Sequence, residues 1–248
     1  MRRVLLALWI LTPALLVAQT SRYRDLTFKV QTSTDLTYGS AVSLKTNQVV
    51  ELKLDLYAPI ADPARDRPAV VLVHGGGFTS GSKNNAYLQL LGRGLASRGY
   101  VAVSIDYRLL PSRPTKSSDR LPALYDMKAA VRFVRRNAAS WRVDPDRIAC
   151  LGSSAGAFLC LETAYGTSGS GNSGSPGYRD DVQVVVDLWG ALGDVNEMQV
   201  GDPPLMIVHG TRDTTVPFSR ATALYNRVRQ LGIPHEYYPI QNAGHAPW

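Results

Sequence analysis

The chain has 248 residues, of which 45% are hydrophobic and 19% charged, an ordinary composition that excludes disordered and fibrous proteins. The formal net charge of +7 falls to +5 without Arg2 and Arg3, and the basic residues are spread over several segments without clustered aromatic residues. This distribution indicates a solvated surface and argues against a nucleic-acid partner.

The N-terminus has the pattern of a secretory signal peptide. Arg2 and Arg3 precede the apolar run VLLALWILTPALLV, which is too short for a comfortable membrane span. We expect cleavage near Gln19 or Thr20, so that residues 1–19 are the signal peptide and residues 20–248 form one domain. The protein is then secreted or periplasmic and is not stably inserted in a membrane. An N-terminal anchor or a buried helix is the alternative.

Strand patterns come next along the chain. Residues 49–59 (VVELKLDLYAP) alternate apolar and polar side chains, which predicts an antiparallel edge strand. Later segments are short continuous runs of Val, Ile and Leu that end in Gly, Asp or Ser, and they occur at 69–77, 100–108, 147–154, 182–190 and 204–210. Such runs are typical of parallel strands buried on both faces.

Helical patterns separate these runs. Apolar residues recur at three- and four-residue steps from Leu121 to Val134 and from Ala221 to Leu231. Strands that alternate with such helices predict a doubly wound α/β domain, with a mostly parallel sheet and helices on both faces. Ligands of such domains bind beyond the carboxyl ends of the strands, so functional residues are expected just after each apolar run.

The Gly/Ser-rich loop (residues 166–178, GTSGSGNSGSPGY) is the one low-complexity stretch. It follows a helix and does not connect a strand to a helix N-terminus, so it lacks the context of a phosphate cradle. We expect a flexible loop at the opposite end of the sheet.

Cys150 and Cys160 are the only cysteines, and both lie in apolar segments. Buried free thiols are favoured, although an exported protein allows a disulfide and the sequence leaves this question open. No Cys/His spacing indicates a metal site.

The segment Gly152-Ser153-Ser154-Ala155-Gly156 falls at a predicted turn from strand to helix. In a G-x-S-x-G turn the central hydroxyl is lifted above the sheet edge, and the flanks are small because strand and helix backbones pass closely. The motif alone is weak, and its strand-turn-helix context gives it weight. Ser154 is therefore the candidate nucleophile, and the side chain of Ser153 is expected to point away.

A serine nucleophile needs a general base at the same sheet edge. His74 and His209 each end a strand as His-Gly, a position typical of rings that are hydrogen-bonded to backbone. His235 begins the last strand and is expected near the far edge of the sheet. His245 follows the last strand on its carboxyl side, so it is the candidate base.

The candidate acid is Asp213, which follows the strand at 204–210. It completes the chain order of serine, acid and histidine that this architecture uses. A plain turn or capping role is its alternative. Asp194 is the fallback acid, and Asp187, inside its strand, is a poorer candidate.

Three successive glycines in HGGGF, at residues 74–78, indicate a loop with unusual dihedral angles or a close approach to a ligand. We expect the peptide N–H groups of Gly76, Gly77 and Ala155 to form an oxyanion hole, because the residue after the nucleophile also contributes a donor.

With HGGGF, DYRL, DPDRIACLGSSAG, HGTRD and AGH placed in this order, the chain from about residue 35 onward resembles the α/β-hydrolase superfamily of esterases. It is most similar to carboxylesterases of the hormone-sensitive-lipase and feruloyl/acetyl-xylan-esterase type. The resemblance implies an α/β-hydrolase fold and a Ser-His-Asp ester hydrolase that needs no cofactor. Its substrates would be short-chain, aryl or carbohydrate-linked esters, free or on a polymer. In the DYR motif, Asp106 and Arg108 are expected to be structural, with an ion pair to Asp126.

Two departures from this family pattern stand out. Only residues 191–204 fill the gap where lipase-like relatives often carry a helical cap, so we expect an open site with little or no cap. The sequence stops three residues after His245, where relatives continue with a helix; either the enzyme is minimal or its C-terminus is incomplete. A missing helix would expose apolar sheet surface and loosen the loop that holds His245.

Two other functions remain open. A serine peptidase can use the same fold and triad, although no size-selecting domain is present. A non-catalytic binding protein can use the same scaffold, but it could dispense with the nucleophile, base and donors, which here all occur in order. The sequence does not reveal the oligomeric state or the preferred acyl group.

Overall fold

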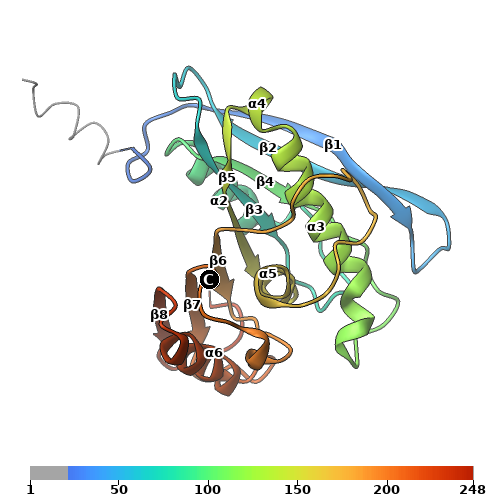
Figure 1. Cartoon of the computed structure of the whole chain (residues 1–248), viewed down its shortest axis with the longest axis vertical. Coiled ribbons are helices and arrows are strands. Elements are labelled where there is room, and N and C mark those ends of the chain that lie inside the picture. Colours follow the sequence, from blue (N-terminus) through green and yellow to red (C-terminus); the bar gives the residue numbers. More distant parts are fainter. Residues whose placement is uncertain (1–21, 248) are drawn as a thin grey trace, which may run out of the picture.

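The computed structural model describes residues 22–247, so the predicted signal peptide lies outside the described residues (Figure 1). No helix in this part of the chain is long and apolar enough to cross a membrane. The elements in chain order are β1 (Val30–Val42), β2 (Val49–Pro59), β3 (Arg67–Val73), α2 (Ala86–Ala96), β4 (Val101–Ile105), η1 (Ser117–Arg120), α3 (Leu121–Arg136), α4 (Ala138–Trp141), β5 (Val143–Ser153), α5 (Ala155–Tyr165), β6 (Val184–Leu188), η2 (Val195–Glu197), β7 (Leu205–Gly210), α6 (Phe218–Leu231) and β8 (His235–Ile240).

The eight described strands form one sheet in the order β1-β2-β4-β3-β5-β6-β7-β8. The pairs β1/β2 and β2/β4 are antiparallel, and all other pairs are parallel. The predicted mostly parallel, doubly wound sheet is thus confirmed. The carboxyl ends of β3 to β8 meet at one edge, and this edge positions the candidate site.

The segment at 49–59 is antiparallel, as predicted, but it is not an edge strand. β1 pairs along it and takes the edge position. The register between the two strands shifts between Ser33 and Leu36 and again between Thr37 and Gly39. These irregularities and the many polar residues of β1 leave no alternating pattern that would reveal the strand in the sequence.

Helices cover both faces of the sheet, as predicted. The larger core cluster packs Leu124 of α3, Leu159 of α5 and Leu224 of α6 against one face. The smaller cluster packs α2, through Leu88, against Leu72 and its neighbours on the other face.

Beside α2, the sheet carries an open apolar hollow of about 510 Å³. Its floor includes Leu151, Val184, Val186 and Met206 from the three strands β5 to β7. Val184 is 38% exposed. Within residues 22–247, apolar sheet surface is therefore exposed on this face.

The Gly/Ser-rich loop is fastened along α3. Lys128 donates from Nζ to the carbonyl oxygens of Ser168 and Gly169, at 2.5 and 3.2 Å. The guanidinium of Arg132 donates to the carbonyl oxygens of Ser170 and Gly174, at 2.8 and 2.9 Å. These donors anchor the backbone of the loop to α3, whereas the flexibility of the loop stays a prediction.

The loop also reaches the carboxyl side of the sheet, where it was not expected. Ser173 donates to Asp126 at 2.6 Å and accepts from Arg108, which follows the carboxyl end of β4. Arg108 forms the expected ion pair with buried Asp126, at 2.9 Å, and also donates its backbone N–H to that carboxylate. Asp106 instead accepts the backbone N–H of Lys83 at 2.7 Å.

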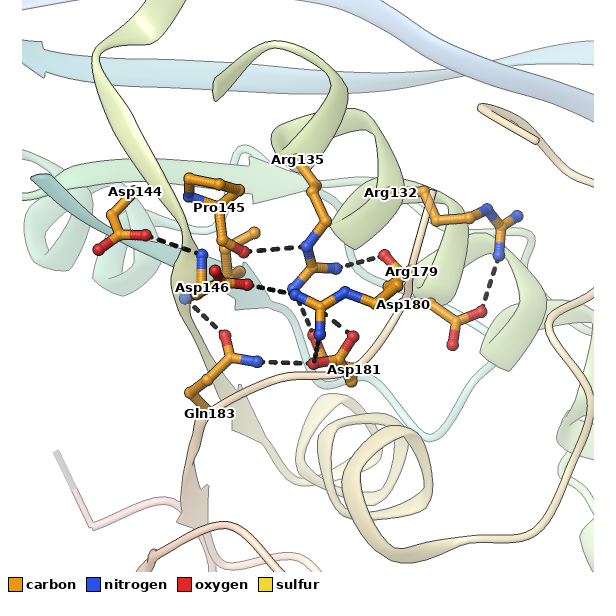
Figure 2. Close-up of polar contacts among 10 residues, drawn as sticks. Arg132, Arg135, Asp144, Pro145, Asp146, Arg179, Asp180, Asp181 and Gln183 are labelled. Atoms are coloured by element: carbon orange, nitrogen blue, oxygen red, sulfur yellow. Dashed lines mark hydrogen bonds and ion pairs between the residues drawn. The ribbon is translucent and has the colours of Figure 1, made fainter. Parts of the chain in front are cut away.

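A second polar network joins the opposite, amino end of the sheet to α3 (Figure 2). Arg135 donates to the carbonyl oxygens of Pro145, at 2.9 Å, and Asp181, at 2.9 Å. The side chain of Gln183 accepts from Ile148 N–H and donates to the Asp181 carboxylate. These contacts fix the starts of β5 and β6 against the helix that covers them.

Cys150 of β5 and Cys160 of α5 are joined by a disulfide. The favoured expectation of free thiols is therefore wrong. The sequence could not decide this, because the pairing depends on how α5 lies on β5. The bond links the strand that precedes the Ser154 turn to the helix that follows it.

Candidate active site

The turn at Ser154 has an unusual backbone that is fixed by its neighbours. Ser154 has φ 51° and ψ −118°, a strained conformation for a non-glycine residue, and its N–H donates to the carbonyl oxygen of Leu188 at 2.9 Å. A Cβ on Gly156 would overlap the carbonyl oxygen of Val73 and lie 2.6 Å from that of His74. Only glycine lets the start of α5 approach the end of β3 this closely.

Three side chains from separate loops form one hydrogen-bonded row. His245 Nε2 lies 2.9 Å from Ser154 Oγ, and His245 Nδ1 lies 2.7 Å from Asp213 Oδ2. A carboxylate at Asp213 accepts a hydrogen bond from Nδ1–H, which leaves Nε2 free to take the serine hydroxyl proton. Ser153 is not part of the row, and its Oγ lies beside Gly75.

Asp213 is held in place from its other oxygen. Its Oδ1 accepts the backbone N–H groups of Thr215, at 2.8 Å, and Val216, at 2.9 Å. The side chain is buried, so Oδ2 faces His245 without competition from bulk water. The turn after β7 therefore fixes the orientation of the carboxylate through these two backbone donors.

The other two acids that the sequence offered do not reach His245. Asp194 is exposed and caps η2 by accepting the N–H of Asn196 at 2.9 Å. Asp187 is buried in β6, where Oδ1 accepts Gly190 N–H at 2.7 Å and Oδ2 has no partner among the described residues. Burial raises the pKa of Asp187 to about 7.

His209 has a contact that the sequence analysis missed. Its Nε2 lies 2.9 Å from the carbonyl oxygen of Val216 and 3.2 Å from Asp213 Oδ2. Burial lowers the pKa of His209, so the ring is neutral and donates from Nε2. It thus makes a second contact with Oδ2, the carboxylate oxygen that also accepts from His245. The position of His209 four residues before Asp213, at a strand end, was the only signal available.

The loop that holds His245 is restrained despite its place near the end of the sequence. Arg212 N–H donates to the carbonyl oxygen of Ala243 at 2.8 Å, and Asn242 N–H donates to Thr211 Oγ1 at 2.9 Å. The expected loosening of this loop is therefore not seen in the structure.

The glycine loop after β3 lies against the serine turn. A Cβ on Gly75 would be 3.2 Å from Ser154 Cβ, and Gly76, Gly77 and Phe78 all have positive φ, at 110°, 58° and 66°. Within residues 22–247, the N–H groups of Gly76 and Gly77 donate to no acceptor. The N–H of Ala155 lies in the first turn of α5, which lacks intrahelical acceptors. All three expected donors are thus free for a ligand.

Aromatic rings pack on His245 and on the helix that follows Ser154. The rings of Trp189 and His245 are edge-to-face with centroids 6.5 Å apart, and Phe78 meets Phe158 of α5 in the same way at 6.2 Å. Ser154 itself is partly exposed. Between β6 and β7 the structure holds only the short helix η2, so no helical cap stands in that gap. The sequence analysis did not single out Trp189 or Phe158, although each follows a motif residue closely.

This arrangement provides a hydroxyl that can lose its proton to an imidazole, a carboxylate that orients the imidazole, and free N–H donors nearby. It has the parts needed for nucleophilic attack on a carbonyl carbon. Among the described residues, no three His, Cys, Asp or Glu side chains gather to hold a metal ion.

Comparisons with known proteins identify the family of the chain. The BD-FAE family profile matches residues 54–202, and the profile of the prolyl oligopeptidase family matches residues 180–247. The chain is 26% identical to Esterase LipQ of Mycobacterium tuberculosis over 78% of its own length and 53% of that protein. It is 36% identical to the probable isoprenylcysteine alpha-carbonyl methylesterase ICMEL1 of Oryza sativa subsp. japonica, over 78% of its length and 54% of that protein.

A solved structure of Thermogutta terrifontis esterase 2, phosphorylated by paraoxon, superimposes with a TM-score of 0.72 at 29% identity. The match covers 87% of this chain and 84% of that one. In contrast, the chain spans about half the length of the two sequence relatives.

Proposed function

Because the chain belongs to the BD-FAE family of α/β-hydrolases, we propose that it is a secreted serine carboxylester hydrolase with a Ser-His-Asp triad. The observation that carries this proposal is the row Ser154–His245–Asp213, with hydrogen-bond distances of 2.9 and 2.7 Å. The esterase names of the relatives and of the structural neighbour support the reaction type. The N-terminal sequence pattern supports export.

The first half of the proposed reaction forms an acyl-enzyme. His245 Nε2 takes the proton of Ser154 as Oγ attacks the ester carbonyl carbon, and Asp213 stabilises the resulting imidazolium without taking its proton. The carbonyl oxygen becomes an oxyanion that accepts hydrogen bonds from the N–H groups of Gly76, Gly77 and Ala155. Each such donor typically stabilises the transition state by about 3 kcal/mol. The imidazolium then protonates the departing alcohol.

The second half repeats these steps with water. His245 takes a proton from water, the hydroxide attacks the acyl carbon, and the same donors hold the second oxyanion. Ser154 leaves with the proton from His245, and a carboxylic acid is released. No cofactor enters this sequence.

The proposed substrates are short-chain, aryl or carbohydrate-linked esters. The absence of a helical cap between β6 and β7 in the described structure favours small acyl groups, or groups carried on a bulky alcohol that extends into solvent.

A serine peptidase is the second candidate, because the prolyl oligopeptidase profile matches residues 180–247, which include Asp213 and His245. The two functions share the triad and differ in the leaving group. Parallel assays with ester and dipeptidyl 4-nitroanilide substrates separate them directly.

The test of the proposed function compares Ser154→Ala with the neighbouring Ser153→Ala. The purified protein should hydrolyse 4-nitrophenyl acetate and butyrate, Ser154→Ala should lose this activity, and Ser153→Ala should retain it. Paraoxon should inactivate the protein and leave a diethylphosphoryl adduct on the peptide that contains Ser154, detected by mass spectrometry. An unmodified wild-type protein that is inactive on both esters would favour the non-catalytic binding role, and an active Ser154→Ala variant would remove Ser154 from the mechanism.

A further inference from the structure

Arg113 lies against the proposed oxyanion loop. A Cβ on Gly77 would be 3.4 Å from Arg113 Nε and 3.8 Å from its Cζ, so the guanidinium packs on one of the proposed donors. The Arg113 residue is exposed. Among residues 22–247 it has no hydrogen-bond or ion-pair partner. An unpaired cation therefore stands next to the point where the ester carbonyl is proposed to bind.

The same side chain borders an open hollow of about 340 Å³. Its other walls are largely apolar and come from the β1–β2 hairpin tip, the segment after β4 and the start of α3, with Leu44, Leu110, Pro111, Pro114 and Pro122 among them. Leu110 donates its N–H to the carbonyl oxygen of Phe78 at 2.8 Å, which ties this hollow to the oxyanion loop. A substituent that extends from the bound ester carbonyl into this hollow would contact its apolar walls and reach the guanidinium of Arg113.

The charges around the hollow leave Arg113 available. Asp119 also borders it, but its Oδ2 already accepts the N–H groups of Thr115 and Lys116, at 2.9 and 3.1 Å, and the Thr115 hydroxyl. Lys45, from the hairpin tip, donates to the carbonyl oxygen of Thr79 at 2.8 Å and has no carboxylate partner among the described residues. Two cations without acidic partners thus flank the loop from Gly76 to Thr79.

We propose that Arg113 selects esters that carry a carboxylate a few bonds from the scissile carbonyl. A guanidinium binds a carboxylate through two parallel N–H···O bonds, and the exposed Arg113 breaks no existing ion pair to do so. Lys45, which donates to Thr79 of the same loop, adds positive potential. The inference rests on the proposed ester hydrolase function and specifies its substrate class.

The test measures a ratio of kcat/KM values, so that any loss common to both esters cancels. On the acyl side, mono-4-nitrophenyl adipate is compared with 4-nitrophenyl hexanoate, in which a methyl replaces the carboxylate. On the alcohol side, the butyryl ester of 4-hydroxybenzoate is compared with that of 4-hydroxybenzamide. The two arms show which part of the ester faces Arg113. Spontaneous hydrolysis is subtracted in each case.

Arg113→Met should lower the charged-to-neutral ratio about fivefold in one arm, the upper range for a solvent-exposed ion pair. Arg113→Lys should keep part of the preference, because a point charge replaces the planar fork. Raising the NaCl concentration from about 0.05 M to about 0.5 M shortens the Debye length and should therefore also lower the charged-to-neutral ratio of the wild type. The matched control is Arg65→Met, which removes the same charge from an exposed arginine in the segment before β3, at the other end of the sheet. Arg65 likewise has no hydrogen-bond or ion-pair partner among the residues that the structure describes.

Equal ratios in wild type and Arg113→Met, in both arms, would overturn the inference while leaving the hydrolase function intact. A drop of the same size in Arg65→Met would also overturn it, because net charge would then be the cause. A wild-type protein inactive on all four esters would refute the proposed function and this inference with it.

Discussion

Replacing Asp213 with asparagine should invert the hydrogen bonding of His245. The two backbone donors from Thr215 and Val216 bind Oδ1, so the asparagine oxygen will occupy that position and its NH₂ group will face His245 Nδ1. An amide N–H in that place donates to Nδ1, and the imidazole proton must then sit on Nε2. The ring can no longer accept the hydroxyl proton of Ser154.

The expected loss follows from two effects. In the wild type, the carboxylate lies 2.7 Å from Nδ1 and stabilises the imidazolium that forms during the reaction. Two unit charges about 4 Å apart interact by about 4 kcal/mol at an effective dielectric constant of about 20, which corresponds to roughly 10³-fold in rate. The wrong tautomer adds to this, and the same replacement in a serine protease triad lowers kcat about 10⁴-fold. We expect Asp213→Asn to lower kcat/KM between about 10³- and 10⁴-fold.

The assay is hydrolysis of 4-nitrophenyl butyrate, with circular dichroism to check that the variant is folded. Asp194→Asn is the matched control, because it makes the same chemical change in an exposed acid that caps η2 and does not touch His245. It should retain wild-type activity. A folded Asp213→Asn protein within tenfold of the wild type would refute this reasoning, and a larger loss in Asp194→Asn would assign the acid role to that residue.

Three further changes test the structure around the site. Gly156→Ala should lower the free energy of unfolding, measured in urea, by about 3 kcal/mol, because the new methyl group overlaps the carbonyl oxygen of Val73. Gly169→Ala is the control and should change the stability little, because a Cβ there has open space around it. Equal effects of the two changes would contradict the close approach of α5 to β3. Burial raises the pKa of Asp187 to about 7, so its contribution to stability is full below about pH 3, falls as the pH rises from about 4 to 7, and is constant above that. Asp187→Asn should match the wild type at about pH 3 and exceed it by about 4 kcal/mol at pH 8, whereas a constant difference would refute the shift. Arg132→Met should speed amide hydrogen exchange in the Gly/Ser-rich loop, since its guanidinium binds two of the loop's carbonyl groups; unchanged exchange would mean that this anchor is unimportant.

The parallel part of the fold could be predicted because buried parallel strands have a recognisable sequence pattern, a short continuous run of apolar residues. β3 and β4 are buried on both faces along most of their length, so they appear as continuous apolar runs. β5 to β7 carry similar apolar runs, although one of their faces borders the open hollow beside α2. Parallel strands also place their carboxyl ends at one edge. This is why Ser154, Asp213 and His245, each just beyond a strand, could be assigned to one row without knowledge of any contact.

Features that depend on contacts between distant polar groups produce no such pattern in the sequence and could not be predicted. β1 is mostly polar and its register is interrupted, so its pairing with β2 had no periodic signal. The Gly/Ser-rich loop is held by arginine and lysine donors that bind backbone carbonyl groups, and any loop sequence carries those acceptors. The contact between His209 and Asp213 likewise depends on the turn that brings Val216 back over the strand end.

The main chain, not the hydroxyl, determines the shape of the turn at Ser154. Its dihedral angles are set by the N–H contact to Leu188 and by the close approach of Gly156 to β3, and none of these requires an oxygen on residue 154. The Ser154→Ala protein should therefore keep an intact recognition surface with no means of breaking the bond. Immobilised on a resin, it becomes a reagent that retains uncleaved esters from a natural extract, and mass spectrometry of the eluate would identify the physiological ligand.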